Sequence, residues 1–123
     1  MNTLFSSIAC AGILSLGACA STSVSPDRVA APKAQIAAAQ EAGADENPQA
    51  ALHLKLANDQ FERAKRLMRD GDNEPAARML DRATVDAELA LELSRLDNTR
   101  SDATDAMKSI ETLRHEHGLM KAE

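Results

Sequence analysis

Apolar residues that recur every three or four positions, most of them alanines, constrain the fold of this 123-residue chain more than any other sequence feature. Between residues 48 and 70 they are Ala50, Leu54, Ala57, Phe61, Ala64 and Met68. After Pro75 they are Ala76, Leu80, Ala83, Ala87 and Ala90. This spacing places side chains on one face of a helix, and small side chains let two helix axes approach closely. The sequence therefore predicts an all-α fold built on an antiparallel helical hairpin, either coiled-coil or tetratricopeptide-like.

Start and stop signals predict the first two helices. A short helix is expected over residues 33–42, because Gly43 follows it as a typical helix terminator. Ten residues make a marginal helix in water, so this segment needs a partner helix. Asn47 and Pro48 suit the cap and the first turn of a helix, and Gly71 suits its end. The sequence thus predicts a second helix between Pro48 and Gly71.

A long C-terminal helix is predicted to follow, with Glu74 and Pro75 in its first turn. Its later part carries a second apolar series, which we call the interaction stripe: Leu89, Leu93, Leu96, Ala103, Met107 and Ile110. The stripe extends past the preceding helix, so it is expected to pack on residues 33–42, on a second copy or on another protein. We expect either one unbroken helix or two helices with a turn near Asn98. Gly118 is expected to end the helical part.

The first residues predict an export signal. No charged residue occurs between Leu4 and Leu16, and this apolar run is too short to span a bilayer as a helix. Immediately after it, Leu16, Gly17, Ala18 and Cys19 resemble the lipobox of bacterial lipoprotein precursors. The resemblance implies that signal peptidase removes residues 1–18 and that Cys19 carries a diacylglycerol. Two or three acyl chains hold a protein on a membrane essentially permanently.

The predicted mature chain has three parts. Residues 19–32 form the lipidated cysteine and a flexible tether rich in Ser, Ala and Pro, residues 33–118 form the helical domain, and residues 119–123 form a tail. Ala20 follows the lipidated cysteine, and the sorting rule of enteric lipoproteins then implies the outer membrane. The expected location is the cell envelope, with the domain facing the periplasm.

Composition and motifs argue against several functions. A net charge of −5 and a pI near 5.2 do not suit nucleic-acid binding, and Phe61 is the only aromatic residue after Ala18. No nucleophile, P-loop or dinucleotide-binding motif occurs, so we predict neither an enzyme, nor a cofactor, nor a small-molecule substrate. His115 and His117 do not share a helix face, so no metal site is predicted. His53 is expected on the polar side of its helix, at the surface.

A set of small residues and turn residues from Lys33 to Arg100 resembles a bacterial family. These residues are Ala34, Ala38, Gly43-Ala44, Pro48, Ala57, Ala64, Gly71-Asp72, Ala76-Ala77, Ala83, Asp86-Ala87 and Ala90. Their spacing is similar to that of small lipoproteins with a domain of unknown function, the group numbered 4398. The resemblance implies an envelope lipoprotein of unassigned activity. We expect a non-enzymatic structural or protein-interaction module; the alternative is a periplasmic binding module for a peptide, a cell-wall fragment or a metal.

Overall fold

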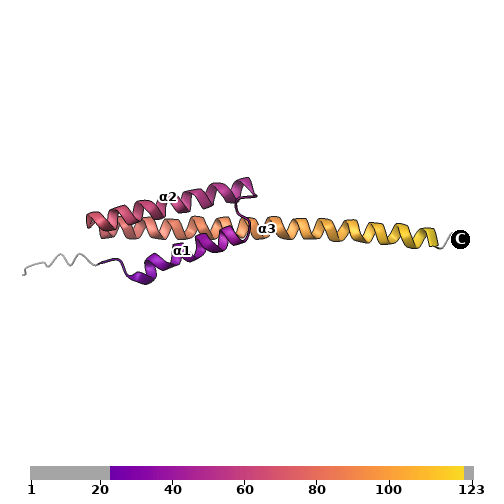
Figure 1. The fold of residues 1–123 in the computed structure, drawn as a ribbon, viewed down its shortest axis with the longest axis horizontal. Coiled ribbons are helices and arrows are strands. Elements are labelled where there is room, and N and C mark those ends of the chain that lie inside the picture. Colours follow the sequence, from indigo (N-terminus) through magenta and orange to yellow (C-terminus); the bar gives the residue numbers. More distant parts are fainter. Residues whose placement is uncertain (1–22, 121–123) are drawn as a thin grey trace, which may run out of the picture.

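The computed structural model describes residues 23–120, which form three helices: α1 (Pro26–Glu41), α2 (Pro48–Asp70) and α3 (Asn73–Met120). Figure 1 shows α1 and α2 lying along the first half of α3, while the second half of α3 extends alone. The prediction of an all-α fold is confirmed. The predicted cleavage and lipidation residues 16–19 lie outside the described residues.

Contacts with α3 fix the direction of the two shorter helices. Arg28 at the start of α1 pairs with Asp81 of α3, and the Asn98 side chain donates a hydrogen bond to the Ala42 carbonyl at the end of α1 (3.1 Å). Helix α1 therefore runs parallel to α3. Helix α2 joins α3 through a short turn and runs antiparallel to it, which is the predicted hairpin.

Helix α2 has the predicted boundaries, and local chemistry explains them. The Asn47 side-chain oxygen accepts hydrogen bonds from the backbone N–H groups of Gln49 (2.9 Å) and Ala50 (3.0 Å). Pro48 sits in the first turn, where no N–H is required. At the other end Gly71 has φ of +86°, a left-handed conformation that suits glycine and ends the helix.

Helix α1 begins earlier than predicted. It starts at Pro26 rather than Lys33, so half of the segment predicted as a tether (residues 19–32) is helical. Pro26 is in the first turn, and Pro32 lies inside the helix with its ring buried in the core. From the sequence alone the two prolines favour a non-helical tether. In the structure, however, Pro26 occupies the first turn, where proline is tolerated, and Pro32 buries its apolar ring against the neighbouring helices.

Helix α3 is unbroken, which decides between the two predicted alternatives. It passes through Asn98 without a turn and continues to Met120, so Gly118 does not end it and the predicted tail begins too early. Neither glycine nor proline occurs between Pro75 and Gly118. Four hydroxyl side chains after Asn98 donate to the carbonyl four residues earlier and so remain compatible with a helix: those of Thr99, Thr104, Ser109 and Thr112.

The core lies between the three helices and consists mainly of alanine. The predicted faces are buried: Ala50, Leu54, Ala57 and Ala64 in α2, and Ala76, Leu80, Ala83, Ala87 and Ala90 in α3. Phe61 is half-buried against this core, and Ile36 and Ala39 join it from α1. Alanine offers little apolar area per residue, but it lets backbones pack closely over a long interface.

Candidate interaction surface

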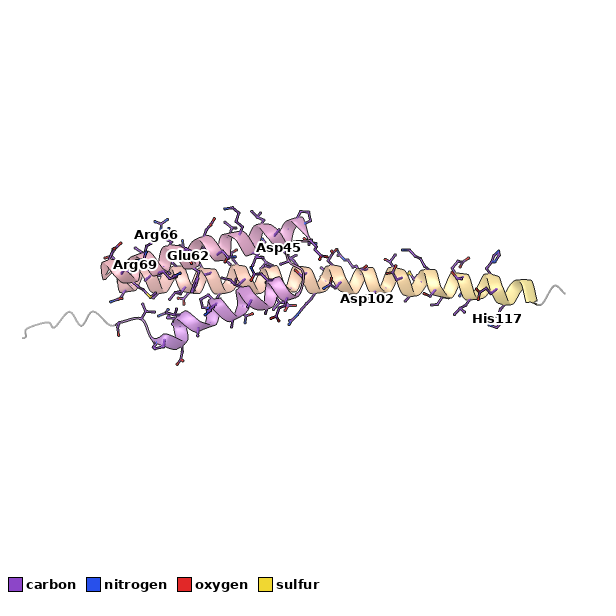
Figure 2. The ribbon with its side chains drawn as sticks, in the orientation of Figure 1. Asp45, Glu62, Arg66, Arg69, Asp102 and His117 are labelled. Carbon is purple, nitrogen blue, oxygen red and sulfur yellow. The ribbon has the colours of Figure 1, made fainter. Side chains whose placement is uncertain are left out.

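The part of α3 beyond Asn98 contacts neither α1 nor α2. The described side chains from Thr99 to Gly118 are all exposed. Figure 2 shows them pointing outward from a lone helix, with Asp102 near its beginning and His117 near its end. We call residues 99–120 the free segment of α3. A helix in a protein gains most of its stability by packing its apolar face against other elements. The apolar face on this unpacked segment therefore requires an explanation.

Most of the predicted interaction stripe is exposed. The exposed fractions are 42% for Leu89, 46% for Leu96, 70% for Met107 and 50% for Ile110, and Ala103 is exposed as well. Leu89 and Leu96 lie on the bundle and the other three residues lie on the free segment. The stripe therefore continues past the end of the bundle on the same face of α3, with Arg100 between its two parts.

One residue of the predicted stripe behaves differently. Leu93 is half-buried and packs against the core beside α1 and α2. It supports the bundle as well as bordering the stripe, so its substitution would disturb the fold. Conversely, Leu113 is 54% exposed and extends the apolar surface beyond Ile110. Leu113 could have been added to the stripe from the sequence, because it lies three residues after Ile110 and so on a neighbouring part of the same helix face.

Helix α1 does not cover the stripe. Its buried residues Ile36 and Ala39 belong to the cluster that contains Ala87, Ala90 and Leu91, on another face of α3. The sequence left three candidates that the stripe could pack on, and the structure excludes the first of them, residues 33–42. A second copy and another protein remain.

Charged residues flank the stripe in a distinctive pattern. Glu92, which borders the stripe, already pairs with Arg95 (2.6 Å), and Asp105 pairs with Lys108 (3.0 Å) on the far side of the helix. By contrast Asp97, Arg100, Glu111 and Arg114, which border it, form no ion pair within residues 23–120. All four are exposed. Their charges are available to a partner that covers the apolar residues.

A half-buried polar cluster joins α2 to α3. The His53 ring donates through Nδ1 to Asp86 Oδ1 (2.9 Å), and Gln60 Nε2 donates to Asp86 Oδ2 (2.7 Å). The His53 side chain is 28% exposed, so it lies half-buried at the edge of the contact between α2 and α3 and not fully at the surface. His53 and Gln60 are seven residues apart, a spacing that puts them on one helix face. The cluster fastens the hairpin, and it lines neither of the two hollows described in this structure.

The larger hollow lies between the start of α1 and the turn from α2 to α3. It has a volume of about 630 Å³ and is lined by Ser23, Val24, Ser25, Arg28, residues 71–75 and Ala77. Its one cationic group is already engaged, because Arg28 donates to both Asp81 carboxylate oxygens (3.1 and 2.7 Å) and the pKa of Arg28 is raised by that hydrogen bond and by the charge of Asp81. No group of three metal-ligating side chains gathers anywhere in residues 23–120.

A comparison with protein families gives a match over most of the helical part of the chain. The model of the family described as Domain of unknown function (DUF4398) matches residues 27–106, a range that includes nearly all of α1, all of α2 and the first part of the free segment. No curated protein and no solved structure matches the chain. None of the described helices is both long and apolar enough to cross a bilayer.

Proposed function

The chain belongs to the DUF4398 family, and we propose that it acts as a lipid-anchored, non-enzymatic protein-interaction module of the cell envelope. The observation that carries the proposal is the exposed interaction stripe, whose apolar residues continue from the bundle onto a part of α3 that no other residue between 23 and 120 packs against. Contiguous exposed apolar surface bordered by charges is typical of protein-binding sites.

The anchor proposed at Cys19 would orient this surface. Residue 19 lies seven residues before Pro26, and α1 starts at the same end of the bundle as α3. Helix α3 is about 72 Å long, at 1.5 Å per residue. A lipid on Cys19 would therefore hold one end of the bundle at the outer membrane and direct the free segment into the periplasm.

Lipidation is tested in cells that express the full chain. We expect labelled palmitate to enter the protein, and globomycin to leave a larger, unprocessed form. Cys19→Ser should abolish the label and release the domain from membranes. If the unaltered protein takes up no palmitate, or if globomycin leaves its size unchanged, the anchor is refuted.

The interaction surface is tested by crosslinking in cells. A photoreactive amino acid at Met107 lies on the stripe, and one at Thr112 lies on the opposite face of the same helix. We expect Met107 to give a defined crosslinked product that Ile110→Asp removes, and Thr112 to give none. Equal crosslinking from both positions, or a product insensitive to Ile110→Asp, would contradict a specific surface.

The alternative function is a binding module for a peptide, a cell-wall fragment or a metal. The observation that favours it is the 630 Å³ hollow, whose lining includes the polar residues Ser23, Ser25 and Asp72. A thermal-shift screen with muropeptides and divalent metals separates the two functions. Saturable stabilisation that Ser25→Trp removes would support the alternative, whereas unchanged melting with every ligand would argue against it.

A further inference from the structure

We infer that the interaction stripe is covered by the same stripe of a second copy, running antiparallel to it. This inference names the partner of the surface proposed above and rests on that proposal. It is carried by the distribution of charge along the free segment. The apolar residues show that the helix needs a partner to pack against. The charged residues decide which partner fits and whether it runs parallel or antiparallel.

The stripe follows the seven-residue pattern of a helix that pairs with another helix. One row contains Leu93, Arg100, Met107 and Arg114, and the second row, three residues later in each repeat, contains Leu96, Ala103, Ile110 and His117. Asp97 and Glu111 flank the first row. Two arginines therefore occupy positions that a self-sufficient apolar seam would fill with leucine or isoleucine.

A parallel pair of copies would oppose like charges. In a parallel arrangement each row faces itself, so Arg100 would meet Arg100 of the second copy, and Arg114 would meet Arg114. Glu92 would also approach Asp97 of the second copy, because the flanking positions of parallel helices meet five residues apart. Like charges in contact are repulsive, so the sequence disfavours this direction.

An antiparallel pair removes the arginine–arginine layers and the approach of Glu92 to Asp97. It brings Asp97 near Glu111 of the second copy, but an arginine from each copy lies beside these two acids. If the pairing is centred near residue 105, each first-row residue meets a second-row residue of the other copy. Arg100 then lies level with Ile110 of the second copy, and Arg114 with Leu96. Small Ala103 meets large Met107, which gives a complementary layer.

The flanking acids complete the match. In this register Arg100 reaches Glu111 of the second copy, and Arg114 reaches Asp97. These are the four charged residues beside the stripe that have no ion-pair partner within the described chain. Each end of the pair then holds two acids and two bases, with no net charge. The long aliphatic parts of the arginines cover the apolar seam while their guanidinium groups reach the acids.

Self-association is tested on a soluble form that begins at Ala20, because the described packing begins after that residue. Sedimentation equilibrium should show a mass that rises with concentration toward two chains. Met107→Glu should return the protein to one chain. Thr112→Glu adds the same charge on the opposite face and should leave the association unchanged. A single-chain mass for the unaltered protein at all concentrations would overturn the inference.

Direction is tested by exchanging charges. Arg100→Glu places an acid beside Glu111 of the second copy and should weaken association at least tenfold, and Glu111→Arg should do the same. The double variant restores opposite charges in an antiparallel pair and should recover most of the affinity. If Arg100→Glu strengthens association, or if the double variant is no better than the single ones, the antiparallel arrangement is wrong.

The size of the in-cell crosslinked product separates this inference from the broader proposal. A product of two chains from Met107 supports self-pairing. A product containing a different protein, together with a single-chain mass in solution, refutes self-pairing and leaves the proposed interaction function intact. Stripe-independent crosslinking would refute both.

Discussion

At the scale of single residues, the bundle depends on side chains that are small rather than large. Ala57 of α2 and Ala87 of α3 are fully buried and belong to the same core cluster. Each contributes little buried apolar area, so it stabilises the bundle mainly by allowing α2 and α3 to pack closely. Larger apolar side chains at these positions should therefore harm the fold, although they add hydrophobic surface.

The corresponding prediction concerns Ala87→Leu. The extra three carbon atoms have no space at a fully buried position, so the variant should lower the free energy of unfolding by about 1–3 kcal/mol. Ala37→Leu makes the same change at an exposed position of α1 and should have little effect. Urea denaturation followed by circular dichroism measures both. A stabilised Ala87→Leu variant would show that the core is loosely packed.

The polar cluster illustrates what sequence patterns miss at this scale. The helical spacing predicted the buried faces well, because the residues of one face recur every three or four positions on the same helix. The sequence places His53 at the surface because it falls on the polar side of its helix. Its actual partner is Asp86, on another helix, and the distance between them depends on how α2 and α3 dock. Such cross-helix contacts require knowledge of the packing and not only of the period.

At the scale of helices, capping chemistry was a better guide than composition. The ends of α2 were predictable because Asn47 accepts backbone hydrogen bonds and Gly71 adopts a left-handed conformation. The start of α1 was missed because Pro26 and Pro32 favour a non-helical tether in isolation, whereas burial of Pro32 compensates in the bundle. Asn98 also looked like a break, but its side chain bonds to Ala42 of the α1 end.

The continuity of α3 leads to a prediction about Ser101→Pro. Proline at this position removes a backbone donor and clashes with the preceding turn, so the helix should break just beyond the bundle. The remaining free segment is about a fifth of all helical residues and is marginally stable alone, so helicity should fall by up to that fraction.

The bundle should survive this break, because its packing ends near Asn98. The melting temperature of Ser101→Pro should therefore stay close to that of Ser101→Ala, while self-association is lost. Circular dichroism and sedimentation measure the two properties on the same samples. A large fall in melting temperature would mean that the free segment supports the bundle, contrary to the contacts described above.

At the scale of the whole molecule, the parallel course of α1 and α3 separates the two functional ends. The chain enters the bundle beside the start of α3, and the free segment lies at the opposite end (Figure 1). An antiparallel pair then places the two entry points at its far ends. Paired copies that are both anchored through Cys19 in the outer membrane would then lie along it, whereas a parallel pair would stand upright on it.

The length of the pair in solution gives the last prediction. A single copy is about as long as α3, about 72 Å, and a parallel pair would have the same length. In the antiparallel pair, each α3 extends about 48 Å from residue 73 to the centre of pairing near residue 105, so the two together span about 96 Å. Small-angle X-ray scattering of the form beginning at Ala20 should thus show the maximum dimension increasing by about 25 Å as concentration rises. Met107→Glu should show no increase. If the scattering mass doubles while the maximum dimension stays constant, the copies pair in the parallel direction, and the ion pairs between Arg100 and Glu111 do not form.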